Sequence, residues 1–153
     1  MVIVGEAPID AGAALERFSS GRTSSGAIVS FTGLCRSESH GNIVDGLYLD
    51  AYPALTARVI EAIEAEARSR FVVDDVLIHH RHGDIGSGEP IVFVAVASAH
   101  RRAAFDAADY LMDQLKTRAP FWKKERRPGG DAWIEPTADD TVRAAAWNME
   151  QDG

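Results

Sequence analysis

The spacing of apolar residues along the chain predicts two long helices and one short one. In 53–70, apolar residues recur every three or four positions, and Pro53 suits the first turn of a helix. The same spacing runs through 101–119, where Pro120 disfavours a further helical turn. A shorter amphipathic pattern over 9–18 predicts the third helix.

Short runs of β-branched and aromatic residues predict strands around these helices. The predicted strands are 2–4, 26–32, 46–52, 75–81, 91–98 and 131–135. The turn-rich residues 83–90 connect two of these strands directly and predict a hairpin. We expect 36–42 to form an exposed polar loop, and 141–147 a terminal helical turn or two. Because several strands follow one another without a helix between them, we expect an α+β fold rather than a doubly wound parallel sheet.

Length and composition indicate one ordinary globular domain over 1–153. The chain has 153 residues, of which 46% are hydrophobic and 25% charged, which suffices for a core. No stretch approaches the roughly 18 to 20 uninterrupted apolar residues of a membrane span, and no basic start precedes a long apolar run. We therefore expect a soluble, unprocessed protein. Cys35 is the only cysteine, which excludes an intrachain disulfide and suits a reducing cytoplasm.

Basic charge is concentrated in one segment of an otherwise acidic chain. Six of the 16 lysines and arginines fall within 116–127 together with one acid, which gives this segment +5 while the whole chain carries −7. Everything outside the segment therefore sums to −12. Phe121, Trp122 and Pro120 inside the run indicate a packed segment rather than a disordered basic tail. We interpret 116–127 as the active site, with a small anion or an acidic tail as its ligand.

Two lysines of this segment are the main candidates for chemistry. Lys116 falls in the last turn of the predicted helix 101–119, and Lys123 follows beyond Pro120. A break at the proline lets both ammonium groups converge, and their repulsion would lower the pKa of one lysine and increase its neutral fraction. A neutral lysine can act as a base or a nucleophile. The alternative is that both are ordinary surface lysines.

Two other positions suit an anion. His100 and Arg101 stand where an apolar strand ends and the second long helix begins, a place where side chains and free helix amides bind anions. The alternative is that Arg101 is merely exposed and that His100 caps the helix. Arg36, in the loop after 26–32, is a weaker single-residue signal.

Other chemistries are less well supported. Of the histidines in 79–82, only His80 and His82 would share a face of a strand, and no cysteine or carboxylate set completes a metal site, so we expect no metal. A lone cysteine such as Cys35 is more often a small buried side chain than a reactive thiol. No glycine fingerprint for a dinucleotide is present, and no cofactor is expected.

Four separated motifs together resemble the MoaE family, the catalytic large subunits of molybdopterin synthase. The motifs are Gly26 to Gly33 followed by Arg36, His80 to Gly83, Ser98 to Arg101, and Leu115 to Glu125. The last contains the specific pattern Lys-x-x-x-Pro-x-Trp-Lys-x-Glu, and the match covers about 2–135, leaving 136–153 as a C-terminal extension. Within the loop, Cys35 and Ser37 depart from the family's usual residues, which leaves the detailed contacts of the loop open.

The resemblance implies an α/β-hammerhead fold with a mixed or antiparallel sheet, and a sulfurtransferase of molybdenum cofactor biosynthesis. A homodimer would form a heterotetramer with a small ubiquitin-like carrier subunit, whose C-terminal Gly-Gly thiocarboxylate supplies sulfur. The acceptor would be cyclic pyranopterin monophosphate, and the product the dithiolene of molybdopterin. Lys116 and Lys123 would be catalytic. Substrate-binding roles would belong to Arg36, His100, Arg101, Lys124 and Glu125.

Two other functions are compatible with the same residues. A non-catalytic module could use the basic and aromatic segment 116–127 to bind RNA or an acidic peptide. Alternatively, the chain could bind the carrier and be an inactive scaffold, although it retains both lysines, His100 and Arg36. Turnover of the pterin distinguishes the enzyme from both alternatives.

Overall fold

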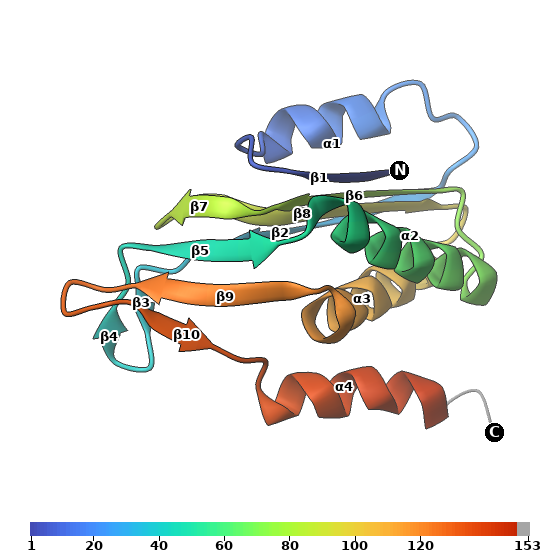
Figure 1. Ribbon diagram of the computed structural model, residues 1–153. Helices are drawn as coiled ribbons and strands as arrows, with labels where there is room; N and C mark the ends of the chain where they lie inside the picture. Colours follow the sequence, from blue (N-terminus) through green and yellow to red (C-terminus); the bar gives the residue numbers. More distant parts are fainter. Residues whose placement is uncertain (150–153) are drawn as a thin grey trace.

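The computed structural model describes residues 1–149, and residues 150–153, the end of the predicted C-terminal extension, lie outside this range (Figure 1). A first sheet has the strand order β1-β6-β8-β2. Its strands are β1 (Val2–Gly5), β6 (Asp75–Arg81), β8 (Pro90–Ser98) and β2 (Ala27–Leu34). β1 runs parallel to β6, and the other pairs are antiparallel. The sheet is therefore mixed, which agrees with the mixed or antiparallel sheet that the family resemblance implies.

A second, fully antiparallel sheet has the order β10-β9-β5-β7. Its strands are β10 (Ala132–Ile134), β9 (Phe121–Arg126), β5 (Gly46–Ala51) and β7 (Gly83–Gly86). A small hairpin of β3 (Glu38–Ser39) and β4 (Asn42–Ile43) lies beside it. The basic segment of the sequence is thus the end of a helix followed by a central strand of this sheet.

The helices cover both faces of the first sheet (Figure 1). α2 (Pro53–Arg70) and α3 (Arg101–Arg118) pack on one face, where β6 and β8 contribute Val76, Ile78, Val94 and Val96 to a fully buried core. α1 (Ala11–Ser19) packs on the other face, against Phe93 and its neighbours on β8. Because alternate residues of β8 point to opposite faces, both cores use this strand, which explains its almost continuous apolar sequence.

α4 (Ala138–Met149) lies against α3, farther from the sheet (Figure 1). Trp147 packs edge-on against Tyr110 and donates its indole N–H to Asp113 at 2.8 Å. This anchor holds the helix along α3 and leaves its first turn near the C-terminal end of that helix. No helix within residues 1–149 is long and apolar enough to cross a membrane.

The predicted α+β class and the two long helices are confirmed, and most segment predictions agree with the structure within about two residues. The predicted pairing of 75–81 with 91–98 is also correct, since β6 and β8 are antiparallel neighbours. The connection between them is more than a turn, because β7 leaves the first sheet to pair with β5 in the second. The loop at 36–42 contains β3 and β4, and the terminal helix is longer than the expected turn or two.

Gly46 allows the close approach of β5 to β7. A Cβ atom at this position would lie 2.5 Å from the backbone carbonyl oxygen of Ile85, which cannot move without shifting the strand. We expect Gly46→Ala to lower the free energy of unfolding by about 1–3 kcal/mol, as for other overpacked sites. Gly129→Ala is the matched control, since nothing lies within 4 Å of its Cβ position, and it should change stability by less than about 0.5 kcal/mol. Urea unfolding of both variants measures this difference, and equal stabilities would contradict it.

Candidate active site

A cavity of about 960 Å³ opens between the two sheets and the adjoining ends of α3 and α4. Its walls come from the end of β2, the β3–β4 hairpin, the last two turns of α3, β9, and the segment that leads from β10 into α4, with single residues of β5 and β6 and the start of β8. Four of the predicted site residues line it: Arg36, Lys116, Lys123 and Glu125. Segments that are distant in the sequence therefore converge on one hollow, as the hypothesis requires.

The strand geometry of β9 divides the basic segment between two faces. Alternate strand residues point to opposite sides, so Phe121, Lys123 and Glu125 face one way while Trp122 and Lys124 face the other. The side chain of Lys124 lies over the rings of Tyr48 and Trp133, which are outside the described cavity lining. The structure therefore does not bring Lys124 to the cavity, in contrast to the prediction for this residue.

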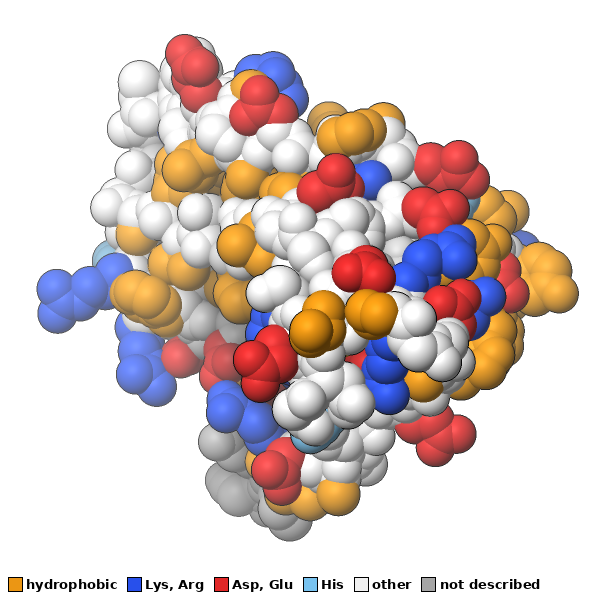
Figure 2. All heavy atoms as spheres, turned by 90° about the vertical axis from the view of Figure 1, so that its left-hand side faces the viewer, with side chains coloured by type: hydrophobic (Ala, Val, Ile, Leu, Met, Phe, Trp, Pro, Cys, Tyr) orange, Lys and Arg blue, Asp and Glu red, His pale blue; other side chains and the backbone are white. Residues whose placement is uncertain are grey.

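Most of the positive charge in 116–127 is balanced by acids from other parts of the chain. The pairs are Lys116 with Asp140, Arg118 with Glu66, Lys124 with Asp131, Arg126 with Asp84 and Asp131, and Arg127 with Glu125. Figure 2, which views the end of the molecule where β3 and β4 lie, shows basic side chains beside acidic ones. Among the six basic residues of the segment, only Lys123 has no acidic partner within 4 Å in residues 1–149. Of the basic residues concentrated in this segment, one, Lys123, therefore remains without an acidic partner in the described part of the chain, and it lies in the cavity.

Lys123 is half-buried, and its environment favours the neutral amine. Burial lowers the pKa of Lys123, and the positive charge of Lys116 lowers it further, against a smaller opposing effect of Asp140. The predicted convergence of the two lysines and its effect on a pKa therefore agree with the structure. Such a lysine has a larger share of free amine near neutral pH than an exposed one, which suits a base or a nucleophile.

Lys116 lies in the last turn of α3, where the carbonyl end of the helix favours a cation. Its Nζ donates a hydrogen bond to the Asp140 carboxylate in the first turn of α4, at 2.8 Å. This hydrogen bond lowers the pKa of Asp140. The carboxylate of α4 therefore pairs directly with Lys116, and its opposing effect on the pKa of Lys123 is smaller than that of Lys116.

Glu125 is almost fully buried, at 3% exposure, and also faces the cavity. Burial on its own would raise the pKa of Glu125, but hydrogen bonds from Arg127 and Ser39 bring it below its ordinary value. Arg127 donates through Nε at 2.9 Å. Glu125 is therefore an ionised, firmly held carboxylate that connects β9 with the β3–β4 hairpin beside the cavity.

His100 and Arg101 lie far from the two lysines. Both are exposed at the N-terminus of α3, and the His100 side chain makes no capping hydrogen bond to the helix. Fifteen residues separate Arg101 from Lys116, which corresponds to about 22 Å along a helix at 1.5 Å per residue. Within one chain, these two residues therefore cannot join the cavity that Arg36, Lys116 and Lys123 line.

His80, the first residue of the motif 80–83, also lines the cavity, and its pattern in the sequence predicts no role there. It is 7% exposed and stacks on Phe121 with ring centroids 4.1 Å apart. The stacking partner comes from the other sheet, and a contact between two sheets leaves no local pattern in the sequence. In residues 1–149 there is no group of three or more histidine, cysteine or carboxylate residues arranged to hold a metal ion.

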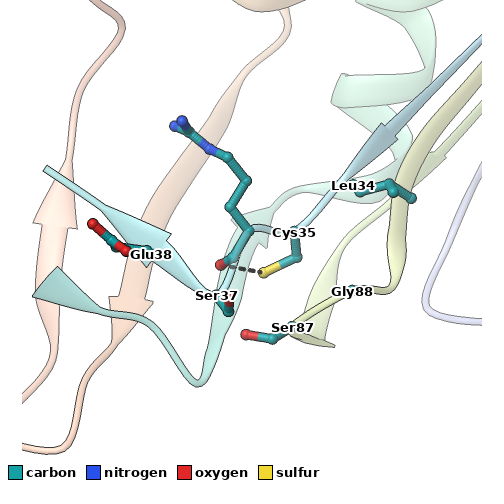
Figure 3. A pocket seen from close by; sticks show the side chains of 7 residues that line it. Leu34, Cys35, Ser37, Glu38, Ser87 and Gly88 are labelled. Carbon is teal, nitrogen blue, oxygen red and sulfur yellow. Dashed lines mark hydrogen bonds between the residues drawn. The ribbon is translucent and has the colours of Figure 1, made fainter. Parts of the chain in front are cut away.

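A smaller hollow of about 580 Å³ lies next to the cavity, and Cys35 lines it together with Ser37 and Ser87 (Figure 3). The cysteine is buried, and its thiol points along the loop to the carbonyl oxygen of Arg36 at 3.8 Å. Burial raises the pKa of Cys35, which keeps the sulfur protonated and weakly nucleophilic. The structure thus agrees with the interpretation of Cys35 as a small buried side chain.

A family model, sequence relatives and solved structures all point to the same protein family. The family model "MoaE protein" matches residues 4–118. The molybdopterin synthase catalytic subunit of Caulobacter vibrioides is 49% identical, over 98% of this chain and 99% of its own length. A MoaE structure from Burkholderia ambifaria superposes with a TM-score of 0.81 at 34% identity and covers 97% of both chains. Molybdopterin synthase from Staphylococcus aureus gives a TM-score of 0.79 at 28% identity, over 86% of this chain and 95% of the other.

The pKa of Lys123 provides a direct test of the site's electrostatics. The chain has only three lysines, at 116, 123 and 124, so each side-chain signal can be assigned by NMR in protein with isotope-labelled lysine. We expect Lys123 to titrate at the lowest pH, and Lys116→Ala to raise the pKa of Lys123, because a neighbouring positive charge is removed. Lys124→Ala, on the opposite face of β9, should leave the pKa of Lys123 unchanged. A Lys123 pKa that responds equally to both substitutions would contradict the arrangement.

Proposed function

The chain belongs to the MoaE family of molybdopterin synthase catalytic subunits, an enzyme family of molybdenum cofactor biosynthesis, and we propose that the cavity around Lys123 is its site of sulfur transfer. The donor is the C-terminal thiocarboxylate of a small ubiquitin-like carrier subunit. The acceptor is cyclic pyranopterin monophosphate, and the product carries the dithiolene of molybdopterin. One observation supports this assignment most strongly: Lys116 and Lys123 open into the same cavity, and Lys123 there has no acidic partner among the described residues.

The charges of the cavity suit both reactants. The carrier's thiocarboxylate and the substrate's phosphate are anions, and Arg36 and Lys123 offer cationic donors to them in a partly enclosed space. Positive groups fixed in such a space stabilise developing negative charge more strongly than they would in water. Lys123 is therefore suited to bind the carrier tail or to stabilise the negative charge that develops during sulfur transfer.

The reaction also needs a base, and a lysine amine can serve as one when part of it is neutral. Opening the cyclic phosphate and adding sulfur both move protons, and a base with a lowered pKa can accept them near neutral pH. Lys123 has the lowered pKa, whereas Lys116 is held by Asp140 at the rim of the same cavity. We propose that the pair shares this work, with Lys123 as the base beside the carrier tail and Lys116, held by Asp140, as the proton donor toward the pterin.

The alternative of a non-catalytic module for RNA or an acidic peptide is not supported. A groove for single-stranded nucleic acid needs a continuous row of free cations with stacking aromatic residues. Five of the six basic residues in 116–127 are engaged with acids instead, and the strand splits the segment between two faces. The curated relatives are catalytic subunits, which also favours the enzyme.

His100 and Arg101 fit the proposed function only through a second copy of the chain. They are exposed at the end of α3 that lies about 22 Å from Lys116 along the helix axis, by 1.5 Å per residue. A two-fold dimer brings a surface of one chain to its equivalent on the other, so a site near the axis can take residues from both. We propose a homodimer, within a heterotetramer with two carrier subunits, in which these residues complete the partner's anion pocket.

Reconstituted turnover tests the proposed function. Wild-type protein, thiocarboxylated carrier and cyclic pyranopterin monophosphate should give a dithiolene product detected by mass spectrometry. We expect Lys116→Ala and Lys123→Ala each to lower the rate by roughly 10²- to 10⁴-fold, the usual contribution of acid–base groups. Lys124→Ala is the matched control and should keep the rate within a few-fold. Absence of product from the wild-type chain with active partners would refute the enzyme assignment.

Mixed dimers test the shared site. Lys116→Ala and Arg101→Ala chains, each inactive alone, are combined and allowed to exchange subunits. If Arg101 serves the partner's site, each mixed dimer has one intact site, and equal mixing should restore about a quarter of wild-type activity in a two-fold dimer. If both residues serve the same chain's site, no mixed dimer has an intact site. Activity that stays at the level of the separate variants would therefore rule out the shared site.

A further inference from the structure

One polar atom of the cavity has no role in the reaction as proposed above. The Nδ1 atom of His80 lies 2.8 Å from the backbone carbonyl oxygen of Arg81. A carbonyl oxygen only accepts hydrogen bonds, so Nδ1 carries the proton and Nε2 is an acceptor with a free lone pair. Within residues 1–149 no donor bonds to Nε2, although the residue is nine-tenths buried and lines the cavity.

The surroundings of His80 keep its ring neutral and fixed. Burial lowers the pKa of His80 to about 4, and the charge of Lys123 contributes in the same direction. Stacking on Phe121, with an angle of 18° between the ring planes, restricts rotation of the imidazole. The cavity therefore contains a rigid, uncharged acceptor in addition to its cations.

Among the described residues, Arg81 Nε is the fully buried side-chain atom without a hydrogen-bond partner, so His80 Nε2 is not sealed in the core but open to the cavity, where a ligand or a water can donate to it. The other cavity groups assigned to the substrate, Arg36, Lys116 and Lys123, are cationic donors that suit a phosphate or a carboxylate. These three cannot accept from the N–H groups at the edge of a pterin ring, and the Glu125 carboxylate of the same cavity already accepts from Arg127. His80 is a complementary group, since a neutral imidazole nitrogen accepts from an N–H without adding charge.

We propose that His80 Nε2 accepts a hydrogen bond from an N–H group of the substrate's pterin ring and so contributes to selecting this heterocycle. The inference rests on the proposed function for the identity of the substrate. His80 would be a binding residue for the ring, while the cations bind the anionic ends. The observation behind it is the unpartnered nitrogen of a buried, stacked ring that faces the cavity.

Three substitutions separate the acceptor from the packing of the ring. His80→Asn retains a donor for the Arg81 carbonyl but has no atom at the position of Nε2. His80→Phe retains the stacking on Phe121 but has no acceptor. His80→Gln places an amide oxygen near the position of Nε2 and can accept. His79→Asn is the matched control, because His79 precedes His80 on β6 and points to the opposite face of the sheet.

The test is calorimetric titration of each folded variant with cyclic pyranopterin monophosphate in the absence of carrier, together with thermal unfolding to confirm folding. We expect Asn and Phe at position 80 to weaken binding by about ten-fold or more, since an N–H of the ligand loses its partner. His80→Gln should recover most of the affinity, and His79→Asn should bind like the wild type. Equal affinities for the Phe and Gln variants would overturn the proposal and assign Nε2 to a water. This outcome is distinct from failure of the proposed function, in which the wild-type chain itself neither binds nor converts the pterin.

Discussion

The antiparallel pairing of β9 with β5 is the constraint on which the site depends. It fixes which side chains of the basic segment enter the cavity, because Lys123 pairs with Leu49 in a defined register and a slip of one residue would exchange the two faces. In the observed register, Lys123 and Glu125 face the cavity, and Lys124 lies outside over Tyr48. The break before β9 also separates the strand from the last turn of α3, so Lys116 and Lys123 enter the cavity from different elements.

The electrostatics follow from this arrangement. Acids from four other parts of the chain pair with the surplus bases of the segment, at Asp84, Glu66, Asp131 and Asp140. Exposed pairs of this kind contribute little to stability, roughly 0 to 1 kcal/mol each, but they remove competing cations from the surface around the site. Lys123 is left partly buried beside Lys116, and both effects lower the pKa of its amine. The fold therefore increases the neutral fraction of this lysine, which is the form that can act as a base.

The sequence predicts the helices well and the site only in part. In α2 and α3, apolar residues recur at helical spacing over many positions, and Pro53 marks the start of α2 while Pro120 follows the end of α3. The local pattern therefore suffices to place Lys116 at a helix end. β9 has no such signal, since its sequence, Phe-Trp-Lys-Lys-Glu-Arg, has an aromatic residue and charged residues on each face and therefore no alternation of apolar and polar positions. Contacts between sheets are equally invisible in the sequence. The roles of His80 and Asp140, and the distance of His100 and Arg101 from the lysines, therefore depend on tertiary structure.

In the proposed complex, the carrier tail ends at Lys123 inside the cavity and not on the outer face of β9. A crystal structure of this chain with a carrier ending in Gly-Gly tests it most directly. We expect the terminal carboxylate within about 3 Å of Lys123 Nζ, the distance of a charge-assisted hydrogen bond. A tail that instead ended over Lys124 and Trp133 on the opposite face of the strand, with the cavity empty, would contradict it.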